Sequence, residues 1–169
     1  MRTQSGATLA ATLLLLLVIT LLGITSVQVT HLQEKMSANL QDKELSFVAA
    51  ESALKAGENW VLSQEKEPTV YVTCQAFPCA QQVYENINLS TQPSSWWNSR
   101  SAQYTLSLDN IATNPRFIIE FLQFVPDSPV VGSSAAKSTG VFYYQVTARG
   151  TGSTNDSISV LQTTVARRY

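Results

Sequence analysis

An uncharged stretch near the N-terminus constrains this chain more than any other feature. Between Arg2 and Glu34 no side chain carries a formal charge when His31 is neutral. The apolar part of this stretch, Ala7–Val29, reads ATLAATLLLLLVITLLGITSVQV. As a helix it would be about 35 Å long, and a bilayer core is about 30 Å thick. Its Leu, Ile and Val side chains each favour insertion by roughly 0.3–0.6 kcal/mol, which offsets the threonines. We therefore expect a membrane span over residues 7–29.

Three interpretations of this span are open. A cleaved secretory signal has a shorter apolar core followed by a small-residue cleavage site, which residues 23–25 match poorly. A plain signal anchor would simply keep the span. The third interpretation is a prepilin, because the short leader, residues 1–6, ends in Gly6 and is followed directly by Ala7 and the apolar run. This resembles the leader that a prepilin peptidase removes on the cytoplasmic side of the membrane, leaving the helix in place.

Several segments carry a more specific pattern. They are Leu14–Gly23, Leu32–Met36, Asn39–Asp42, Phe47–Leu54 and Val160–Val165. In this order they resemble PilX-type minor pilins of type IV pili. The resemblance is close over the first third of the chain and loose over the rest. It implies a type IV pilin-like α+β fold, in which a long N-terminal helix packs on an antiparallel sheet.

The resemblance also implies processing, location and partners. The prepilin peptidase would cleave after Gly6 and leave Ala7 as a methylated N-terminus. The chain would be a single-pass protein of the inner membrane of a Gram-negative bacterium, with its C-terminus in the periplasm, and would later reach the pilus tip. Its helix would contact other minor pilins and the major pilin, beside a PilY-type tip adhesin. The implied function is to prime pilus assembly in support of adhesion, twitching motility or DNA uptake.

Two positions depart from the general pilin pattern. Most pilins begin the mature chain with phenylalanine and carry glutamate as its fifth residue, whereas this chain has Ala7 and Ala11 there. In pilins that glutamate pairs with the N-terminal amine of the subunit added just before. Its absence recurs in tip-type minor pilins and in the K-type pseudopilin of type II secretion. Ala11 therefore argues against a major shaft subunit.

A helical pattern continues beyond the span and predicts one helix from about Leu9 to Leu62. We divide it into a transmembrane part, residues 7–29, and an amphipathic periplasmic part, residues 30–64. Lys43 interrupts the apolar stripe and is expected to extend its ammonium outward. The stripe is expected to pack on the protein's own sheet, with a groove for a partner helix as the alternative. Its apolar members are Leu32, Met36, Leu40, Phe47, Ala50, Leu54, Gly57 and Val61.

The composition changes near Pro68, and residues 65–169 are expected to form a β-rich head. The last two predicted strands are separated by a short turn-rich segment, which indicates an antiparallel hairpin. A long helix on such a sheet is an α+β arrangement. The predicted strands are Thr69–Thr73, Gln103–Leu108, Arg116–Phe124, Val141–Ala148 and Ser157–Ala166. Within Arg116–Phe124, alternation places Phe117, Ile119, Phe121 and Gln123 on one face and Ile118, Glu120, Leu122 and Phe124 on the other.

Three local features of the head suggest sites. Cys74 and Cys79 enclose four residues, and in the periplasm we expect them to form a structural disulfide. Trp96 and Trp97 are expected to provide one core anchor and one covering lid, although a binding patch is the alternative. The polar loop over residues 126–140 is either a partner-facing excursion or an ordinary surface loop.

Composition argues against several other functions. His31 is the only histidine and lies beside the apolar run, so neither a Ser-His-Asp triad nor a histidine-based zinc site is expected. We predict no catalytic, cofactor or metal residues and no enzymatic activity. A net charge of −1 indicates no direct nucleic-acid partner. The alternatives are a minor pseudopilin of a type II secretion system, which usually has a large insertion, and a signal-anchored periplasmic binding or hydrolytic domain.

Overall fold

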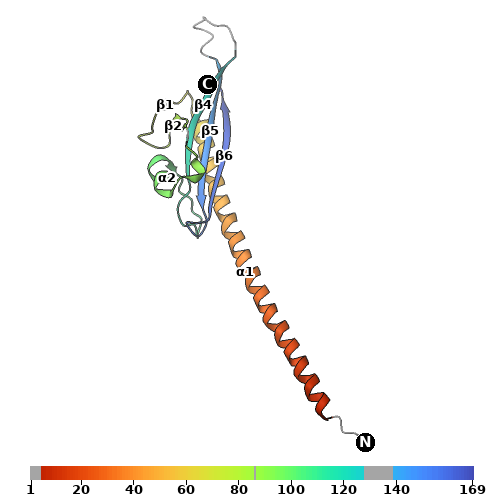
Figure 1. Ribbon diagram of the computed structural model, residues 1–169. Coiled ribbons are helices and arrows are strands. Elements are labelled where there is room, and N and C mark those ends of the chain that lie inside the picture. The colour runs from red at the N-terminus through yellow and green to blue at the C-terminus, as the bar shows by residue number, and fades with distance from the viewer. Residues whose placement is uncertain (1–4, 86, 128–138) are drawn as a thin grey trace. The chain divides into compact units, whose positions relative to one another are not determined.

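One helix dominates the N-terminal part of the structure. The computed structural model describes residues 5–85, 87–127 and 139–169, with only the backbone for residues 5–7. Helix α1 runs without interruption over Ser5–Ser63, close to the predicted limits (Figure 1). The chain divides into two units, Met1–Gln41 and Asp42–Tyr169.

The length of α1 follows from its sequence. Proline, which removes a backbone donor and breaks helices, is absent until Pro68. At the C-terminus the Gln64 backbone N–H donates to the Val61 carbonyl over 3.3 Å, which tightens the last turn. The Gln64 side-chain amide also donates to the Trp60 carbonyl over 3.1 Å. Two carbonyls that would otherwise lack helical partners are thereby satisfied.

The second unit contains a mixed sheet beside the C-terminal part of α1. The strand order is β1-β2-β4-β5-β6, and β3 also pairs with β4. The three long strands β4, β5 and β6 are antiparallel, whereas β1–β2 and β2–β4 are parallel (Figure 1). The predicted α+β, pilin-like class is confirmed. The elements are β1 Val70–Tyr71, β2 Ala80–Gln82, the 3-10 helix Leu89–Thr91, α2 Ser94–Arg100, β3 Ala102–Gln103, β4 Arg116–Pro126, β5 Gly140–Thr151 and β6 Ile158–Arg167.

The predicted strand over residues 103–108 is largely wrong, because β3 ends at Gln103. The alternation of apolar residues there suggested a strand, but the backbone finds other partners. Tyr104 N donates to the Pro115 carbonyl over 2.9 Å, and Leu106 N meets the Asn114 side chain at 3.4 Å. Pro115 has no N–H to return a ladder bond, so the pairing stops.

A β-bulge in β4 corrects the predicted face of Phe124. The register with β5 shifts between Phe121 and Gln123, so that Phe124 pairs with Phe142. The rings of Phe124 and Phe142 are 4.5 Å apart, centroid to centroid. Since the extra residue inverts the alternation, Phe124 joins the face of Phe121 instead of the face of Glu120.

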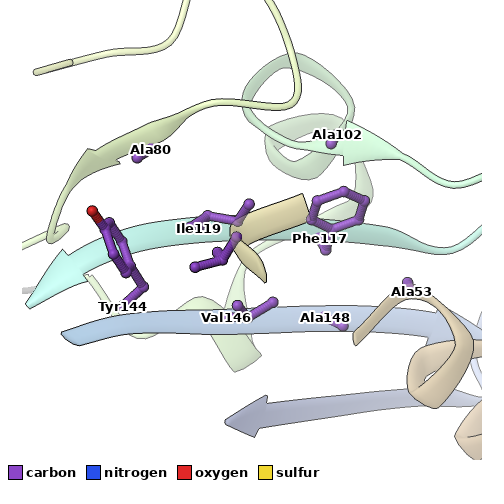
Figure 2. Close-up of a cluster of buried hydrophobic side chains, with 9 residues drawn as sticks. Ala53, Ala80, Ala102, Phe117, Ile119, Tyr144, Val146 and Ala148 are labelled. Carbon is purple, nitrogen blue, oxygen red and sulfur yellow. The ribbon is translucent and has the colours of Figure 1, made fainter. Parts of the chain in front are cut away.

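The main core lies between α1 and the sheet and depends on small residues of the helix. Ala49, Ala50 and Ala53 are fully buried. A Cβ at Gly150 of β5 would collide with the backbone of Ser46 and Ala50, so the helix packs directly on that strand. Figure 2 shows Ala53 of α1 facing Val146 and Ala148 of β5, together with side chains from β2, β3 and β4. The core residues are Ala53, Val61, Ala80, Ala102, Phe117, Ile119, Tyr144, Val146 and Ala148.

The apolar stripe of the helix is only partly buried. Its later members Ala50, Gly57 and Val61 pack on the sheet as predicted. Phe47 is largely exposed, as are Leu32, Met36 and Leu40. Lys43 was expected to extend its ammonium outward, but the ammonium instead donates to the Ile158 carbonyl at the start of β6.

Candidate functional site

The first half of α1 presents an almost wholly apolar surface. From Leu9 to Val29 its large apolar side chains are exposed, and the helix is long and apolar enough to cross a membrane. Its threonine hydroxyls turn back on the helix. Thr12 donates to the Leu9 carbonyl over 3.0 Å and Thr20 to the Leu17 carbonyl over 2.9 Å. These polar groups therefore need no partner from lipid or from another protein.

Ala11 lies in a shallow groove along this helix. The groove has a volume of about 640 Å³ and is lined by apolar and threonine side chains. Gly6 and Ala7, the predicted processing positions, belong to the first turns of α1, where only the backbone is described. The lining residues are Ala11, Thr12, Leu15, Leu16, Ile19 and Thr20.

Polar contacts fasten α1 to the β5–β6 hairpin within the second unit. Asp42 accepts from both the backbone N–H and the hydroxyl of Ser153, and from the Thr154 hydroxyl over 3.0 Å. The Ser153 hydroxyl is the chief cause of a lowered pKa for Asp42. One turn further along the helix, the hydroxyls of Ser46 and Ser159 lie 2.7 Å apart in a buried pair.

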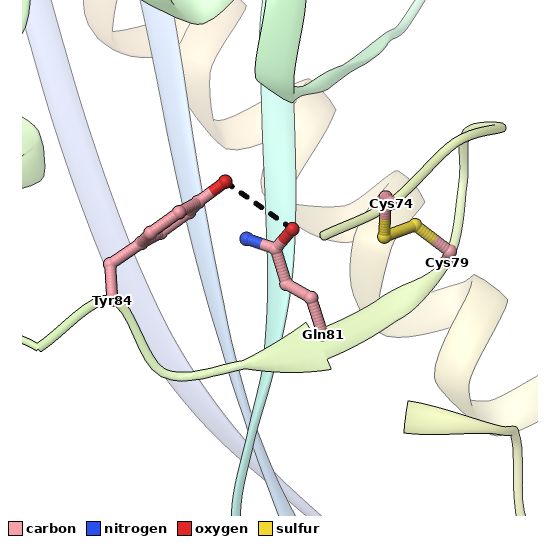
Figure 3. The surroundings of a disulfide bond; sticks show 4 residues. All are labelled: Cys74, Cys79, Gln81 and Tyr84. Atoms are coloured by element: carbon pink, nitrogen blue, oxygen red, sulfur yellow. Dashed lines mark hydrogen bonds between the residues drawn. A yellow bond between two sulfur atoms is a disulfide. The ribbon is translucent and has the colours of Figure 1, made fainter. Parts of the chain in front are cut away.

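A disulfide between Cys74 and Cys79 closes a small loop beside the sheet. The Cα atoms of the two cysteines are 6.2 Å apart. The loop leads directly into β2, where the Gln81 side chain accepts from the Tyr84 hydroxyl over 3.4 Å (Figure 3). Val72, just before the loop, is 73% exposed. The loop therefore fixes the entry of β2 and leaves apolar side chains at the surface.

The tryptophan pair supplies an anchor and a lid, as predicted. Trp97 is fully buried in a second core cluster with Leu89 and Ile118, on the face of the sheet opposite α1. Trp96 is half-buried and covers this cluster edge-on, 5.8 Å from the Trp97 ring. The guanidinium of Arg100 lies 5.4 Å from the centre of the Trp96 ring. This arrangement accounts for both side chains as packing.

The same outer face of the sheet buries charged residues that the sequence reasoning did not single out. Glu120 of β4 is 2% exposed, and burial raises its pKa. Arg116 and Arg149 are directly opposite each other on β4 and β5. Burial lowers the pKa of Arg149, with a further contribution from Arg116. Alternation in β4 placed Glu120 opposite the helix-facing residues, but no pattern predicted that the 83–100 segment would cover it.

Two family models match the chain over nearly its whole length. The model described as PilX N-terminal matches residues 5–55, and the model described as type IV pilus assembly protein PilX C-term matches residues 56–167. The chain belongs to the PilX family of type IV pilus assembly proteins. No curated protein and no solved structure matched it.

Membership in the PilX family identifies the chain as a structural component of a type IV pilus. The apolar first half of α1 agrees with a membrane-anchored pilus component. Within the described residues no group of three or more His, Cys, Asp or Glu side chains could hold a metal ion. His31 is exposed, 3.9 Å from Glu34. The loop over residues 126–140 lies mostly outside the described residues, which resume at Thr139.

Proposed function

We propose that this PilX-family chain is a minor pilin that primes type IV pilus assembly and stays in the complex at the pilus tip. The observation that carries the proposal is Ala11. From Thr8 to Thr30 no side chain of α1 is charged, so the helix brings no carboxylate into the filament core. Such a subunit suits the first position of the filament, where no earlier subunit offers an N-terminal amine.

A carboxylate at position 11 would have opposite effects in the first subunit and in the subunits added later. A carboxylate at position 11 of the first subunit would be buried in an apolar core without a partner, which costs several kcal/mol. In a later subunit it would gain on the order of 4 kcal/mol of Coulomb attraction to the N-terminal amine of its predecessor, before desolvation. Ala11 avoids the cost at the tip and forgoes the gain in the shaft.

The remaining assignments rest on the same proposal. The leader would be residues 1–6, followed by a membrane and filament helix over 7–29, a periplasmic helix over 30–64 and a head over 65–169. The apolar helix can leave lipid only for another apolar environment, which neighbouring pilin helices supply. Its partners would be other minor pilins, the major pilin, a PilY-type adhesin and, during processing, the prepilin peptidase. Adhesion, twitching or DNA uptake would be the behaviour served.

Immunogold labelling of sheared filaments tests the tip position. We expect label at or near filament ends, and fewer pili when the chain is deleted. Ala11→Glu should lower pilus number or allow label along the shaft. Ala10→Glu is a matched control for entry into the shaft, because it places the same charge one residue away, on a different side of the helix, and should give no label along the shaft. Dense labelling along the whole wild-type shaft would refute the tip position.

A further inference from the structure

Glu120 is a buried carboxylate that lacks a cationic partner within the described residues. It lies in the middle of β4, opposite Gln145 of β5, on the face of the sheet turned away from α1. Its Oε1 accepts from the backbone N–H of Tyr84 over 2.8 Å. The side-chain ion pairs of the described residues join other carboxylates, and none reaches Glu120. A buried carboxylate without a counter-ion is costly, so its presence calls for a reason.

Glu120 lines a groove of about 380 Å³ between the sheet and the segment over residues 83–90. The segment contributes both apolar and polar side chains, with Val83 and Ile87 exposed at the rim. The strands β5 and β6 contribute Val160 and the amide and hydroxyl groups of Gln145, Thr147 and Gln162. The groove thus combines apolar surface, neutral polar groups and one carboxylate.

The negative charge of Glu120 is not needed to hold the segment in place. The contact with Tyr84 is an acceptor contact, and the side-chain oxygen of a glutamine could make it equally well. Glutamine would also avoid the cost of burying a charge. The contact with Tyr84 therefore does not by itself account for a glutamate at this position.

The chain's own cations on this face are held elsewhere. Arg149 donates to the Ser94 hydroxyl over 3.0 Å. Arg116 donates to the Ser101 carbonyl over 3.3 Å and to the Gln103 side chain over 3.2 Å. Arg100 lies over the Trp96 ring. None of these three arginines forms an ion pair with Glu120 within the described part of the chain.

We propose that this groove receives a lysine or arginine side chain of a protein partner, with Glu120 as its counter-ion. The aliphatic stem would lie against Val83 and Ile87, while the charged end reaches the carboxylate. The amide and hydroxyl oxygens of β5 and β6 would accept its remaining N–H groups. An inserted basic side chain in a desolvated pocket is a typical energetic centre of a protein interface. The inference does not depend on where in the filament the chain resides.

A model side chain tests the recognition directly. The probe is N-acetyl-arginine methylamide, titrated into the full-length chain in detergent micelles with the Glu side-chain carboxyls labelled with ¹³C. We expect the Glu120 carboxyl resonance to shift, and Glu120→Gln to weaken binding at least about tenfold, as for loss of a charged hydrogen bond. N-acetyl-citrulline methylamide, which is neutral, should shift nothing. Glu85→Gln is the matched control, since Glu85 is exposed and does not line the groove.

A photo-crosslinker at the exposed rim residue Ile87 tests the partner in cells. We expect crosslinks that map next to a lysine or arginine of another protein and that Glu120→Gln diminishes while Glu85→Gln does not. Equal binding of the probe by Glu120→Gln, or of the neutral analogue by the wild-type chain, would overturn the proposal. So would crosslinks unaffected by Glu120→Gln. If spermidine binds more tightly than the arginine probe, the groove takes a free cation instead of a partner's side chain.

Discussion

Asp42 of α1 and Ser153 of the β5–β6 turn are joined twice, because the backbone N–H and the hydroxyl of Ser153 both donate to the same Asp42 oxygen, over 2.5 and 2.7 Å. Gly152 makes this approach possible, since a Cβ there would strike the Asp42 carbonyl and carboxylate. Asp42 is also the first residue of the second unit. The turn is therefore anchored at the point where the helix begins to pack on its own sheet.

Asp42→Asn should destabilise the head and change its response to acid. Hydrogen bonding, chiefly from the Ser153 hydroxyl, holds the pKa of Asp42 below its ordinary value of 3.8. A carboxyl with a lowered folded-state pKa stabilises the fold above 3.8, and that stabilisation is lost as pH falls through the folded value. Thermal unfolding of the full chain should be measured from pH 2 to 6. The stability of Asp42→Asn should fall less steeply with decreasing pH than that of the wild type. Asp156→Asn, at an exposed position of the same connection, should keep the wild-type slope.

Gly150→Ala should destabilise the chain by about 1–3 kcal/mol, the usual cost of overpacking. The added methyl would meet the backbone of Ser46 and Ala50, which cannot turn aside as a flexible side chain can. Gly23→Ala provides the control, because nothing lies within 4 Å of a Cβ there. Denaturant unfolding of both variants measures the difference. Equal stability of the two variants would contradict the close packing of α1 on β5.

Cys74→Ser should cost about 2 kcal/mol or less of head stability. The disulfide closes a loop of only a few residues, and such a short loop removes little entropy from the unfolded chain. Alkylation of protein recovered without reduction should label neither Cys74 nor Cys79, and reduction should expose both. Full labelling of both thiols in unreduced protein would show that the bond does not form in the cell.

Sequence patterns predict much of this architecture. The absence of proline before Pro68 and the apolar run were enough to predict α1 within a few residues. Long alternating runs of β-branched and aromatic residues were likewise enough to predict β4, β5 and β6. The short strands were harder. β2 reads Ala-Gln-Gln, which alternates too briefly to be recognised, and its parallel pairing with β4 depends on where the Cys74–Cys79 loop delivers the chain.

The candidate sites also differ in whether they could be predicted from the sequence. Ala11, Cys74 and Cys79 could be named in advance because they fall at fixed distances from a recognisable start or from each other. Glu120 could not, since it is singled out by burial beneath a segment whose contacting residue, Tyr84, is 36 residues away in sequence. The spacing of two cysteines and the distance from a recognisable start can be read from the sequence, whereas burial is a property of the folded chain.

Intact-mass measurement of the membrane-extracted protein examines the processing expected of a prepilin. The mature chain should begin at Ala7, with one methyl group on its amine. Gly6→Val should block cleavage and leave the full-length precursor, because a side chain would obstruct the narrow peptidase cleft. Ser5→Ala, immediately beside it, should be processed normally. A mature terminus after Thr25 would instead identify a conventional secretory signal.

The threonine hydroxyls of α1 have a consequence for the energetics of assembly and disassembly. Thr12, Thr20, Thr25 and Thr30 each donate to a carbonyl of their own helix. Under the proposed function this helix passes from lipid to a bundle of other helices, and these four hydroxyls would then make and break no hydrogen bonds with the surroundings. For these groups the transfer would be nearly balanced and reversible, so they would give it no preferred direction.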